Sequence, residues 1–564
     1  MIQDFLTESA KKVMKDTFGV TDIDIRWEFP RESTFGDLAS SVALSVSKSA
    51  GKSPRDIAEA IVKNISTVKG VAKAEVAGAG YVNVWLTPEA LIARLAETRK
   101  ACVPAVKRKG KRPVIVEYSQ PNIAKPLGVH HLLSTMIGQC LANIYRHQGY
   151  ETISINHLGD WGTQFGKLAV ALKKWGTKPV RECTLDDLLD LYVRFHEEAE
   201  KDAALEDEAR ETFRKIEAGD KELRGFWKDV VEITMGQINL LYKRLHVSFD
   251  HVHGESFYED KMKPIIEEGK KKKVFVEGQD GALIVEFPEA SKLPPAIVIK
   301  GDGATIYLTR DLATVEYRVS TWHPEAILYV VDVAQSLYFQ QLFATVQKLG
   351  WDLPHLEHVV VGRMRFADRS MSTRKGNILR LREFLDESVT RATAVIKEHG
   401  EGIHTDDPEA LAEMMGIGAV VYGIVSQNRR MDMVFDLEKF LSFEGNSAPY
   451  LQYTHARAKS VLGKAGDIGS VKDIAELSDA ERALINMLLK FAVALEEARA
   501  THMPHTLANF LYSLCQQFNA FYNAEPILKA PEPQKALRLH LTELTATVLK
   551  TGASLLTLSV PDRM

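Results

Sequence analysis

The stretch from Glu117 to Ser134, EYSQPNIAKPLGVHHLLS, is the feature that most constrains this chain. An apolar, β-branched run, Val114 to Val116, precedes it and predicts a buried strand. Apolar residues then recur at three- and four-residue spacing from His131, which predicts a helix that stops near Gly149. A second strand is expected over residues 153–155.

Strand, polar turn, helix and strand in this order form one unit of a doubly wound parallel sheet, in which ligands bind beyond the carboxyl ends of the strands. The unpaired backbone N–H groups and the positive dipole at the start of such a helix attract phosphate. Two imidazoles, His130 and His131, lie at this helix start. The segment therefore predicts a nucleotide site.

The motif PNIAKP, followed by a histidine-containing quartet and LLST, resembles the first signature of the arginyl-tRNA synthetases, which are class I aminoacyl-tRNA synthetases. The family pattern has histidine, a small apolar residue, glycine and histidine, whereas this chain has Gly128, Val129, His130 and His131. Only the last histidine matches, and we expect Gly128 to let the loop shift so that His130 reaches the phosphates. The residues that the resemblance implies for ATP binding and catalysis in this segment are Lys125, Pro126, Gly128, His130 and His131.

Length and composition indicate a globular protein of several domains. With 564 residues we expect three or four domains, and the contents of 45% apolar and 26% charged residues are ordinary. No run reaches membrane-spanning length, and the N-terminus resembles neither a signal nor a transit peptide, so we expect a cytoplasmic protein with no membrane partner. The net charge of −4 confines contact with a polyanion to local basic patches. Four scattered cysteines predict four buried thiols and no metal site.

Residues 1 to about 105 combine helical patterning with short strands around a glycine turn near Gly78 and Gly80. On residue chemistry alone this is a small α/β domain without a ligand. The segments FGDLASSVAL and VAGAGYVNVWL are similar to the extra N-terminal domain of the family, which implies contact with the tRNA elbow. The basic run from Lys107 to Arg112 is expected to be a domain linker, and contact between this run and RNA stays open.

The segment His157 to Gly166, HLGDWGTQFG, has two interpretations: close approach of the backbone to a ligand, or a tight turn around a buried Trp161. Its resemblance to the family segment favours the ligand. From about 175 to 290 the strand and helix alternation is lost, so we expect an insertion with a long helical stretch over residues 185–245. His251 and His253 are expected at the surface rather than in a metal site, and residues 270–273 in an exposed loop.

We expect the sheet to resume at Ala296, before the motif DGATIYLTRDLA. Tyr307 and Asp311 are four residues apart, and a phenol with a carboxylate suits a guanidinium, whereas the alternative is a plain helix start with Asp311 paired to a surface arginine. The motif resembles the arginine pocket of the family, as does the strand over residues 326–331. The residues that the resemblance implies for L-arginine binding are Glu117, Ser119, Asn122, Tyr307, Asp311 and Gln335. The family pattern has histidine before Phe339, where this chain has Tyr338.

The loop RSMSTRKGN, which follows a strand over residues 359–361, resembles the second class I signature, Lys-Met-Ser-Lys-Ser. Ser370 and Thr373 replace its two lysines. The residues that the resemblance implies for ATP binding or catalysis here are Met371, Ser372, Arg374 and Lys375.

From about 391 the periodicity predicts an all-helical bundle, in which aromatic residues at helical spacing are mostly core. The segments YLQYTHARAKSVL and QFNAFYN resemble the anticodon-binding bundle of the family. The tRNA contacts that this resemblance implies are Tyr453, Arg457, Phe518 and Tyr522.

The expected fold is a multidomain α/β protein. It comprises an α/β N-terminal domain (1–105), a class I Rossmann-type parallel-sheet catalytic domain (106–390, with the insertion at about 175–290) and an all-α C-terminal bundle (391–564). The resemblance implies an arginine–tRNA ligase that uses ATP and Mg²⁺, takes L-arginine and tRNA(Arg) as substrates and acts as a monomer. Two alternatives stay open: a class I synthetase for glutamate or glutamine, and a tRNA-binding paralogue with impaired catalysis, which Gly128, Ser370 and Thr373 favour.

Overall fold

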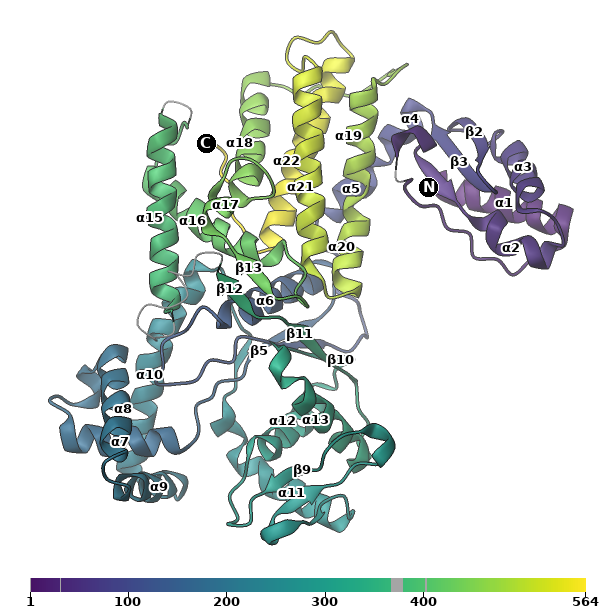
Figure 1. The fold of residues 1–564 in the computed structure, drawn as a ribbon. Coiled ribbons are helices and arrows are strands. Elements are labelled where there is room, and N and C mark those ends of the chain that lie inside the picture. Colours follow the sequence, from purple (N-terminus) through teal and green to yellow (C-terminus); the bar gives the residue numbers. More distant parts are fainter. Residues whose placement is uncertain (1, 31, 367–378, 401–402) are drawn as a thin grey trace.

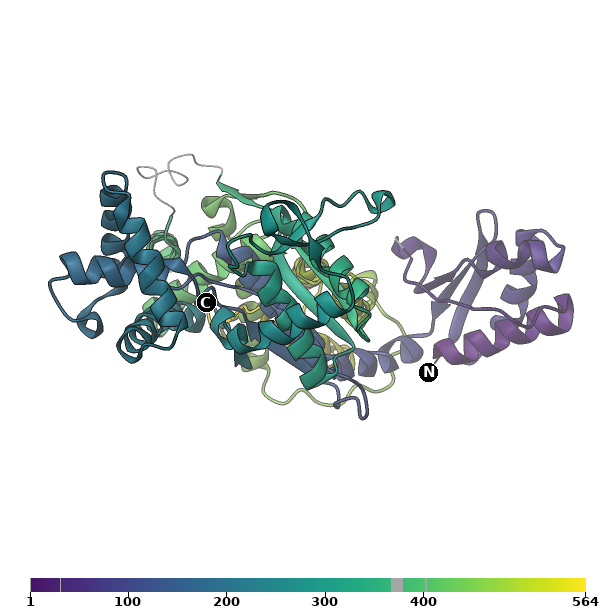
Figure 2. The same cartoon turned by 90° about the horizontal axis from the view of Figure 1, so that it is seen from below.

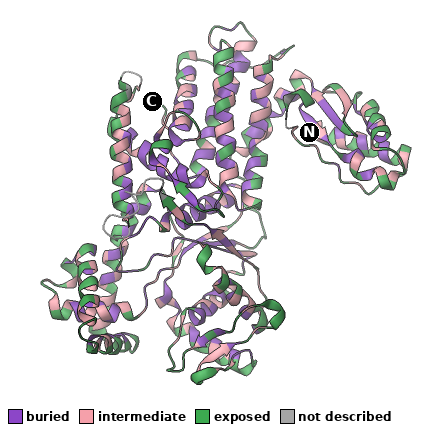
Figure 3. Ribbon diagram, in the orientation of Figure 1, coloured by how far each residue is buried: buried purple, intermediate pink, exposed green. Residues whose placement is uncertain are grey.

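The computed structural model describes residues 2–30, 32–366, 379–400 and 403–564. A parallel sheet lies at the centre, with a tall helical bundle on one side of it and two smaller lobes on the other (Figure 1). The N-terminal domain lies beside the bundle and the lobe formed by α7 to α10 lies at the opposite end, as the second view also shows (Figure 2). Figure 3 shows that buried residues are concentrated in the sheet and along the inner faces of the bundle helices.

The N-terminal domain is an antiparallel three-stranded sheet, in the order β1-β3-β2, packed against helices. The predicted glycine turn joins β2 to β3, and a Cβ on Gly80 would meet Pro54 at 2.8 Å. The α/β prediction for this region is confirmed. Its elements are α1 (Ile2–Phe18), β1 (Leu38–Ser40), α2 (Val42–Ala50), α3 (Pro54–Ile65), β2 (Val71–Ala77), β3 (Tyr81–Leu86), α4 (Pro88–Ala93) and α5 (Leu95–Ala101).

The central sheet is entirely parallel, with strand order β11-β10-β4-β5-β6. Val114 and Val116 belong to the core shared with α6 and the bundle, whereas Ile115 belongs to the core beneath α12 and α13. Helices thus cover both faces, which is why β4 is apolar at successive positions. The elements are β4 (Val114–Glu117), α6 (His131–His147), β5 (Thr152–Asn156), β6 (His251–Val252), α12 (Tyr307–Trp322), β10 (Ala326–Asp332), α13 (Ser336–Leu349) and β11 (His355–Val361).

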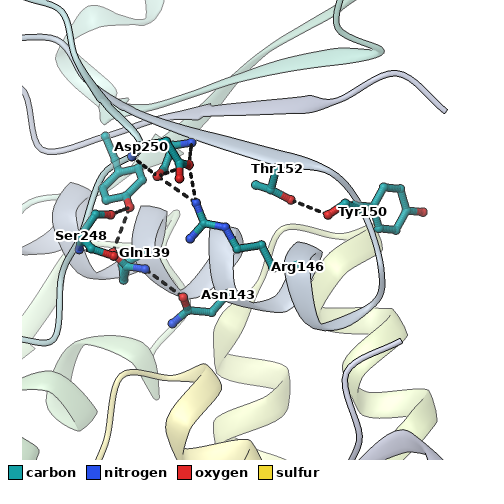
Figure 4. Close-up of polar contacts among 9 residues, drawn as sticks. Gln139, Asn143, Arg146, Tyr150, Thr152, Ser248 and Asp250 are labelled. Atoms are coloured by element: carbon teal, nitrogen blue, oxygen red, sulfur yellow. Dashed lines mark hydrogen bonds and ion pairs between the residues drawn. The ribbon is translucent and has the colours of Figure 1, made fainter. Parts of the chain in front are cut away.

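Polar contacts fix α6 against the sheet (Figure 4). The Tyr118 hydroxyl lies 2.9 Å from Gln139 Oε1, and Gln139 Nε2 donates to Asn143 Oδ1 at 2.8 Å. Further along α6, an Arg146 guanidinium nitrogen lies 2.5 Å from Asp250 Oδ2, which also accepts from the backbone N–H of Ser154 at 2.8 Å. These contacts hold α6, and therefore the start of this helix at His131, in one position relative to β4 and β5.

Two predictions about the sheet are wrong. Residues 296–299 form β9 (Ala296–Ile299) in a separate antiparallel sheet with β7 (Val276–Glu277) and β8 (Leu283–Val285), and its alternating burial is typical of a strand with one face in solvent. The stretch expected as an insertion supplies the edge strand β6 of the parallel sheet. The expected long helical stretch is divided into three helices: α8 (Leu185–Ala199), α9 (Ala204–Glu217) and α10 (Lys221–Arg244). They form a lobe with α7 (Thr163–Trp175). The helix α11 (Met262–Lys271) follows β6.

The C-terminal region is mostly but not entirely helical. The strand β13 (Met433–Phe435) pairs in parallel with β12 (Met364–Phe366), so the all-α prediction is wrong at this point. The helix α16 (Pro408–Val425) is apolar enough, and at 18 residues long enough, to cross a membrane, contrary to expectation, but 72% of it is buried inside the protein. The other helices are α15 (Leu381–His399), α17 (Leu437–Leu441), α18 (Ala448–Ala465), α19 (Asp479–Leu489), α20 (Phe491–Ala500), α21 (Pro504–Ala524) and α22 (Gln534–Leu555).

Three further expectations are corrected in part. Cys140, Cys183 and Cys515 are buried thiols, but Cys102 is only half-buried. His251 and His253 are half-buried and lie in an aromatic cluster, where His253 stacks on Phe257 at 4.1 Å between ring centroids. Residues 270–273 are exposed, as expected, but residues 270 and 271 end α11 rather than forming a loop.

Candidate active site

The backbone between β4 and α6 is held in an unusual conformation. Ser119, Gln120 and Ala124 have positive φ angles of 79°, 49° and 66°, which side chains other than glycine rarely adopt. Neighbouring elements hold this backbone: the N–H of Gln120 donates to Asn156 Oδ1 at 3.2 Å, and that of Ala124 donates to the Thr234 hydroxyl at 3.1 Å. Several residues with positive φ within a short loop at the carboxyl edge of a parallel sheet are typical of a functional loop.

The two imidazoles at the start of α6 lie against each other, with ring centroids 3.9 Å apart. Nδ1 of His131 lies 3.2 Å from both the backbone nitrogen and the carbonyl oxygen of Gly128, so Gly128 holds the ring through Nδ1. In the neutral tautomer that accepts from the Gly128 N–H, the proton is on Nε2. Burial, assisted by the neighbouring His130, lowers the pKa of His131 to about 4, and burial also lowers the pKa of His130. Both rings are therefore neutral near pH 7, and His131 offers an N–H donor rather than a positive charge.

Glu117, at the end of β4, forms an ion pair with Arg318 of α12, which the sequence analysis missed. The Arg318 side chain is fully buried, and Gln120 Nε2 donates to the other carboxylate oxygen of Glu117 at 2.7 Å. Burial alone would raise the pKa of Glu117, but the Arg318 charge and His157 lower it below its usual value. An arginine on an amphipathic helix suggests a solvated face, so only the packing of α12 on the sheet reveals this pair.

Asp311, in the second turn of α12, accepts a hydrogen bond from the Tyr338 hydroxyl, and its other oxygen lies 3.8 Å from His157 Nε2. No arginine or lysine among the described residues forms an ion pair with it, contrary to the alternative of a surface salt bridge. Burial raises the pKa of Asp311, while His157 and the bond from Tyr338 oppose this rise. Tyr307 does not join the pair as predicted: its side chain is 68% exposed at the first residue of α12.

The remaining predicted residues of the arginine site lie around this edge of the sheet. The Ser119 hydroxyl is buried and bonded to Tyr242 at 2.7 Å, so its side chain supports the loop. Asn122 is exposed and lies against Gly159, where an added Cβ would meet Asn122 Oδ1 at 2.3 Å. Gln335 is exposed in the turn that precedes α13.

The glycines of the segment 157–166 are explained by packing within the protein. A Cβ on Gly166 would meet the carbonyl oxygen of Ala209 at 2.1 Å, Gly159 lies against Asn122, and Trp161 is buried. This arrangement agrees with the tight-turn interpretation, and the expected approach to a ligand stays a prediction.

The backbone joins the first signature to the chain that follows the second. The N–H of Val129 donates to the carbonyl of Leu379 at 3.1 Å, and that of Leu381 donates to Leu127 at 2.8 Å. Pro126 lines a cavity of about 420 Å³ beside this junction, and the exposed Lys125 lies 5.2 Å from the Tyr192 ring. The predicted residues of the second signature lie outside the described residues; they are Met371, Ser372, Arg374 and Lys375, together with the replaced positions Ser370 and Thr373.

Three of the four predicted tRNA contacts form one partly exposed cluster. The Arg457 guanidinium lies 4.7 Å from the Tyr453 ring and 5.1 Å from the Tyr522 ring. A cation between two phenols offers both charge and stacking surface. The prediction for Phe518 is wrong, because its side chain is fully buried in the bundle core. No group of three or more side chains of the kinds that bind metals occurs among the described residues.

Family models match nearly the whole chain. The model described as "tRNA synthetases class I (R), catalytic domain" matches residues 92–437, "DALR anticodon binding domain" matches 451–564 and "Arginyl tRNA synthetase N terminal domain" matches 2–86.

Similar proteins agree with these matches. The chain is 39% identical to an arginine–tRNA ligase of Fusobacterium nucleatum over 538 residues, or 94% of each chain, and 38% identical to one of Clostridioides difficile over the full length of both. Among solved structures, the arginyl-tRNA synthetase of Thermus thermophilus has a TM-score of 0.82 at 26% identity, with all of both chains covered. That of Plasmodium falciparum has a TM-score of 0.80 at 23% identity, covering 100% of this chain and 99% of the other, which bears on the fold.

Proposed function

This chain belongs to the arginyl-tRNA synthetase family, and from this premise we propose how its residues carry out the reaction. The protein is an arginine–tRNA ligase with a class I fold: it uses ATP to activate arginine and transfers the arginyl group to tRNA. In the first step the arginine carboxylate attacks the α-phosphorus of ATP and pyrophosphate leaves. In the second, a hydroxyl at the tRNA 3′ end attacks the carbonyl carbon and AMP leaves.

We assign the guanidinium of the substrate to Asp311. This carboxylate has the Tyr338 hydroxyl and the His157 imidazole beside it but no arginine or lysine ion pair among the described residues, so it can accept a cationic fork. Glu117, whose charge is already shared with Arg318, holds the α-amino group through its remaining lone pairs, with Asn122 and Gln335 beside it. Tyr307 lies at the exposed mouth of the site, where closure around the substrate would bring it in.

We assign the phosphates of ATP to the start of α6. The first turn of this helix has no side-chain cap, and the N–H groups of His131 and Leu132 donate to the carbonyls of Gly128 and Val129. The positive end of the helix dipole therefore supplies the attraction for an anion here. His131 donates from Nε2 to a phosphate oxygen, and His130, Lys125 and the second signature loop add further contacts. Mg²⁺ would reach this site with ATP and would neutralise part of the charge on the phosphates.

The tRNA extends from this site to the bundle. We propose that Tyr453, Arg457 and Tyr522 contact the anticodon arm and that the N-terminal domain (residues 1–105) contacts the elbow, with residues 106–390 catalytic and 391–564 forming the anticodon-binding region. The enzyme acts as a monomer in the cytoplasm. The partly exposed cation between two phenols is the observation that supports the anticodon assignment.

The assignment of the arginine site rests on Asp311, whose carboxylate forms no ion pair with an arginine or lysine among the described residues. The test is aminoacylation of unfractionated tRNA with labelled arginine, beside ATP–pyrophosphate exchange with and without tRNA, for the wild type and Asp311→Asn. We expect charging with arginine and not with glutamate, glutamine or lysine, and an arginine KM raised at least about 100-fold in the variant. An unchanged KM would remove Asp311 from the site, and tRNA binding without charging would favour the non-catalytic alternative.

A further inference from the structure

The two carboxylates of the candidate arginine site have different partners. Glu117 is paired with the fully buried guanidinium of Arg318 and also accepts from Gln120. Asp311 forms no ion pair with an arginine or lysine among the described residues, and its carboxylate accepts a hydrogen bond from the hydroxyl of Tyr338. A partly buried carboxylate without a fixed cation depends on its hydrogen-bond donors, both for its charge and for its orientation.

The contact joins two helices that begin side by side. Asp311 lies in the second turn of α12 and Tyr338 in the first turn of α13, and both helices cover the same face of the central sheet. Tyr338 is half-buried against the core beneath this face. Its ring therefore has a fixed place, and its hydroxyl holds Oδ2 of Asp311 while Oδ1 faces His157.

We propose that Tyr338 is a positioning residue for arginine recognition, whose hydroxyl orients the Asp311 carboxylate toward the guanidinium of the substrate. The inference rests on the proposed arginine site. A carboxylate has about four lone-pair positions, so one bond from Tyr338 leaves enough for a two-pronged guanidinium contact. Without the hydroxyl the carboxylate can rotate, and a fork that needs both oxygens in one plane binds less tightly.

The hydrogen bond from Tyr338 also affects the ionisation of the Asp311 carboxylate. The charged and titratable groups that face Asp311 come from several elements. They are Tyr338 from α13, His157 from the segment after β5, Glu117 from β4, Glu255 from the segment after β6, Tyr329 from β10 and Arg318 from α12 itself. Burial raises the pKa of Asp311, and the bond from Tyr338 is among the contacts that oppose the rise. Loss of this bond raises the pKa further, so the ionised carboxylate that arginine requires is reached only at higher pH.

The experiment compares Tyr338→Phe with the wild type. We expect the KM for arginine to rise about tenfold, as for loss of one hydrogen bond to a charged group, while the KM values for ATP and tRNA and the kcat stay within about twofold. The acidic limb of kcat/KM for arginine moves to higher pH. Tyr338→His, which keeps an N–H donor, restores part of the arginine KM.

The matched control is Tyr317→Phe, on the same helix as Asp311. The Tyr317 hydroxyl forms no hydrogen bond among the described residues, so this variant keeps the wild-type KM and pH profile. If Tyr338→Phe also keeps both, the inference is overturned while the arginine site stands. If Asp311→Asn keeps the wild-type arginine KM, the proposed site itself fails.

Discussion

At the scale of single residues, the chemistry depends on how neighbours fix a proton. His131 has its Nδ1 held by the backbone of Gly128 and a pKa lowered to about 4, so its imidazole is neutral near pH 7. A neutral imidazole stabilises negative charge on a phosphate through a directed N–H bond, and a low-dielectric site makes this bond effective.

His131→Ala should therefore lower the rate of arginyl-adenylate formation by about 100-fold or more, as for loss of one oriented donor in an active site. His130→Ala, which removes an exposed ring that lies tilted against His131, should lower the rate by a smaller factor, about tenfold. Single-turnover adenylate formation measures both variants. A His130 variant with the full wild-type rate would contradict its role at the phosphates, and a rate for His131→Ala within threefold of wild type would contradict the donor role.

The sequence predicts those site residues that belong to local motifs and misses those that act through contacts with distant residues. Glu117, His131 and Asp311 belong to local motifs, so their positions could be read from the chain alone. Arg318 and Tyr338 gain their roles only from contacts across the sheet and between two helices, and neither has a local pattern. Phe518 and Tyr522 show the reverse: both fit an aromatic pattern, but the turn of the helix buries one and exposes the other.

At the scale of elements, the approach of α6 to β4 requires a glycine. A Cβ on Gly138 would lie 2.2 Å from the Tyr118 side chain, so the helix can pack this closely only without a side chain there. Gly236, in the middle of α10, has no atom within 4 Å of the same position. The two glycines thus differ in packing while sharing a helical backbone.

Gly138→Ala should destabilise the protein by about 1–3 kcal/mol through overpacking, and it should also lower activity because α6 carries His131. Gly236→Ala should instead stabilise it by about 0.5–1 kcal/mol, since alanine loses less backbone entropy in a helix. Thermal unfolding of the two variants beside the wild type measures the contrast. Equal melting temperatures for the two variants would show that α6 has room for a methyl group.

The elements missed from the sequence are short strands with unusual partners. The pattern of residues 296–299 indicates a strand correctly but cannot state which sheet it joins, because pairing depends on distant residues. β6 and β13 have two and three residues, too few for a periodicity to appear, and each is defined by its partner strand.

At the scale of the whole molecule, buried polar contacts hold the N-terminal domain on the bundle. Asp37 is 1% exposed, and its carboxylate accepts from Arg482 at 2.5 Å, from Asn486 at 2.8 Å and from the N–H of Leu86 at 2.7 Å. The hydroxyl of Thr98 donates to the carbonyl of Leu488 at 3.0 Å nearby. The two regions proposed to contact tRNA are therefore joined through α19.

Asp37→Ala should release this contact, because removing one partner of a buried ion pair costs about 3–5 kcal/mol. The KM for tRNA should rise about fivefold or more while the KM values for arginine and ATP stay unchanged. Asp24→Ala, which removes a carboxylate from an exposed pair with Arg26, is the control. Steady-state aminoacylation and small-angle scattering follow the change, and a wild-type tRNA KM in the Asp37 variant would contradict the anchoring role.

A second contact links the catalytic sheet to the bundle and depends on pH. Glu357 of β11 lies 3.0 Å from His502 Nδ1, and this bond together with the charge of His502 lowers the pKa of Glu357 to about 2. A carboxylate whose pKa is lower in the folded state contributes stability above its unfolded pKa and loses it as the pH falls toward the folded pKa.

Glu357→Gln should thus destabilise the protein by about 2–3 kcal/mol at pH 7. The difference from the wild type should shrink as the pH falls below about 5, where the unfolded carboxylate takes up its proton. Melting temperatures measured between pH 7 and pH 4 test this trend. A difference that stays constant over this range would mean that the effect is one of packing alone.

The contact between Asp37 and Arg482 also determines when the N-terminal domain can dock during synthesis of the chain. Asp37 and Arg482 are separated by 445 residues along the chain, and at 5–20 residues per second a ribosome needs roughly 20–90 seconds to make the second after the first. The last helix of the N-terminal domain ends at Ala101, so this domain folds early. It then stays connected through residues 102–113, with the carboxylate of Asp37 in water until α19 is made. Proteases can therefore cut a nascent chain at residues 102–113 until α19 is made. Any product that stops before α19 has an N-terminal domain that cannot dock on the bundle.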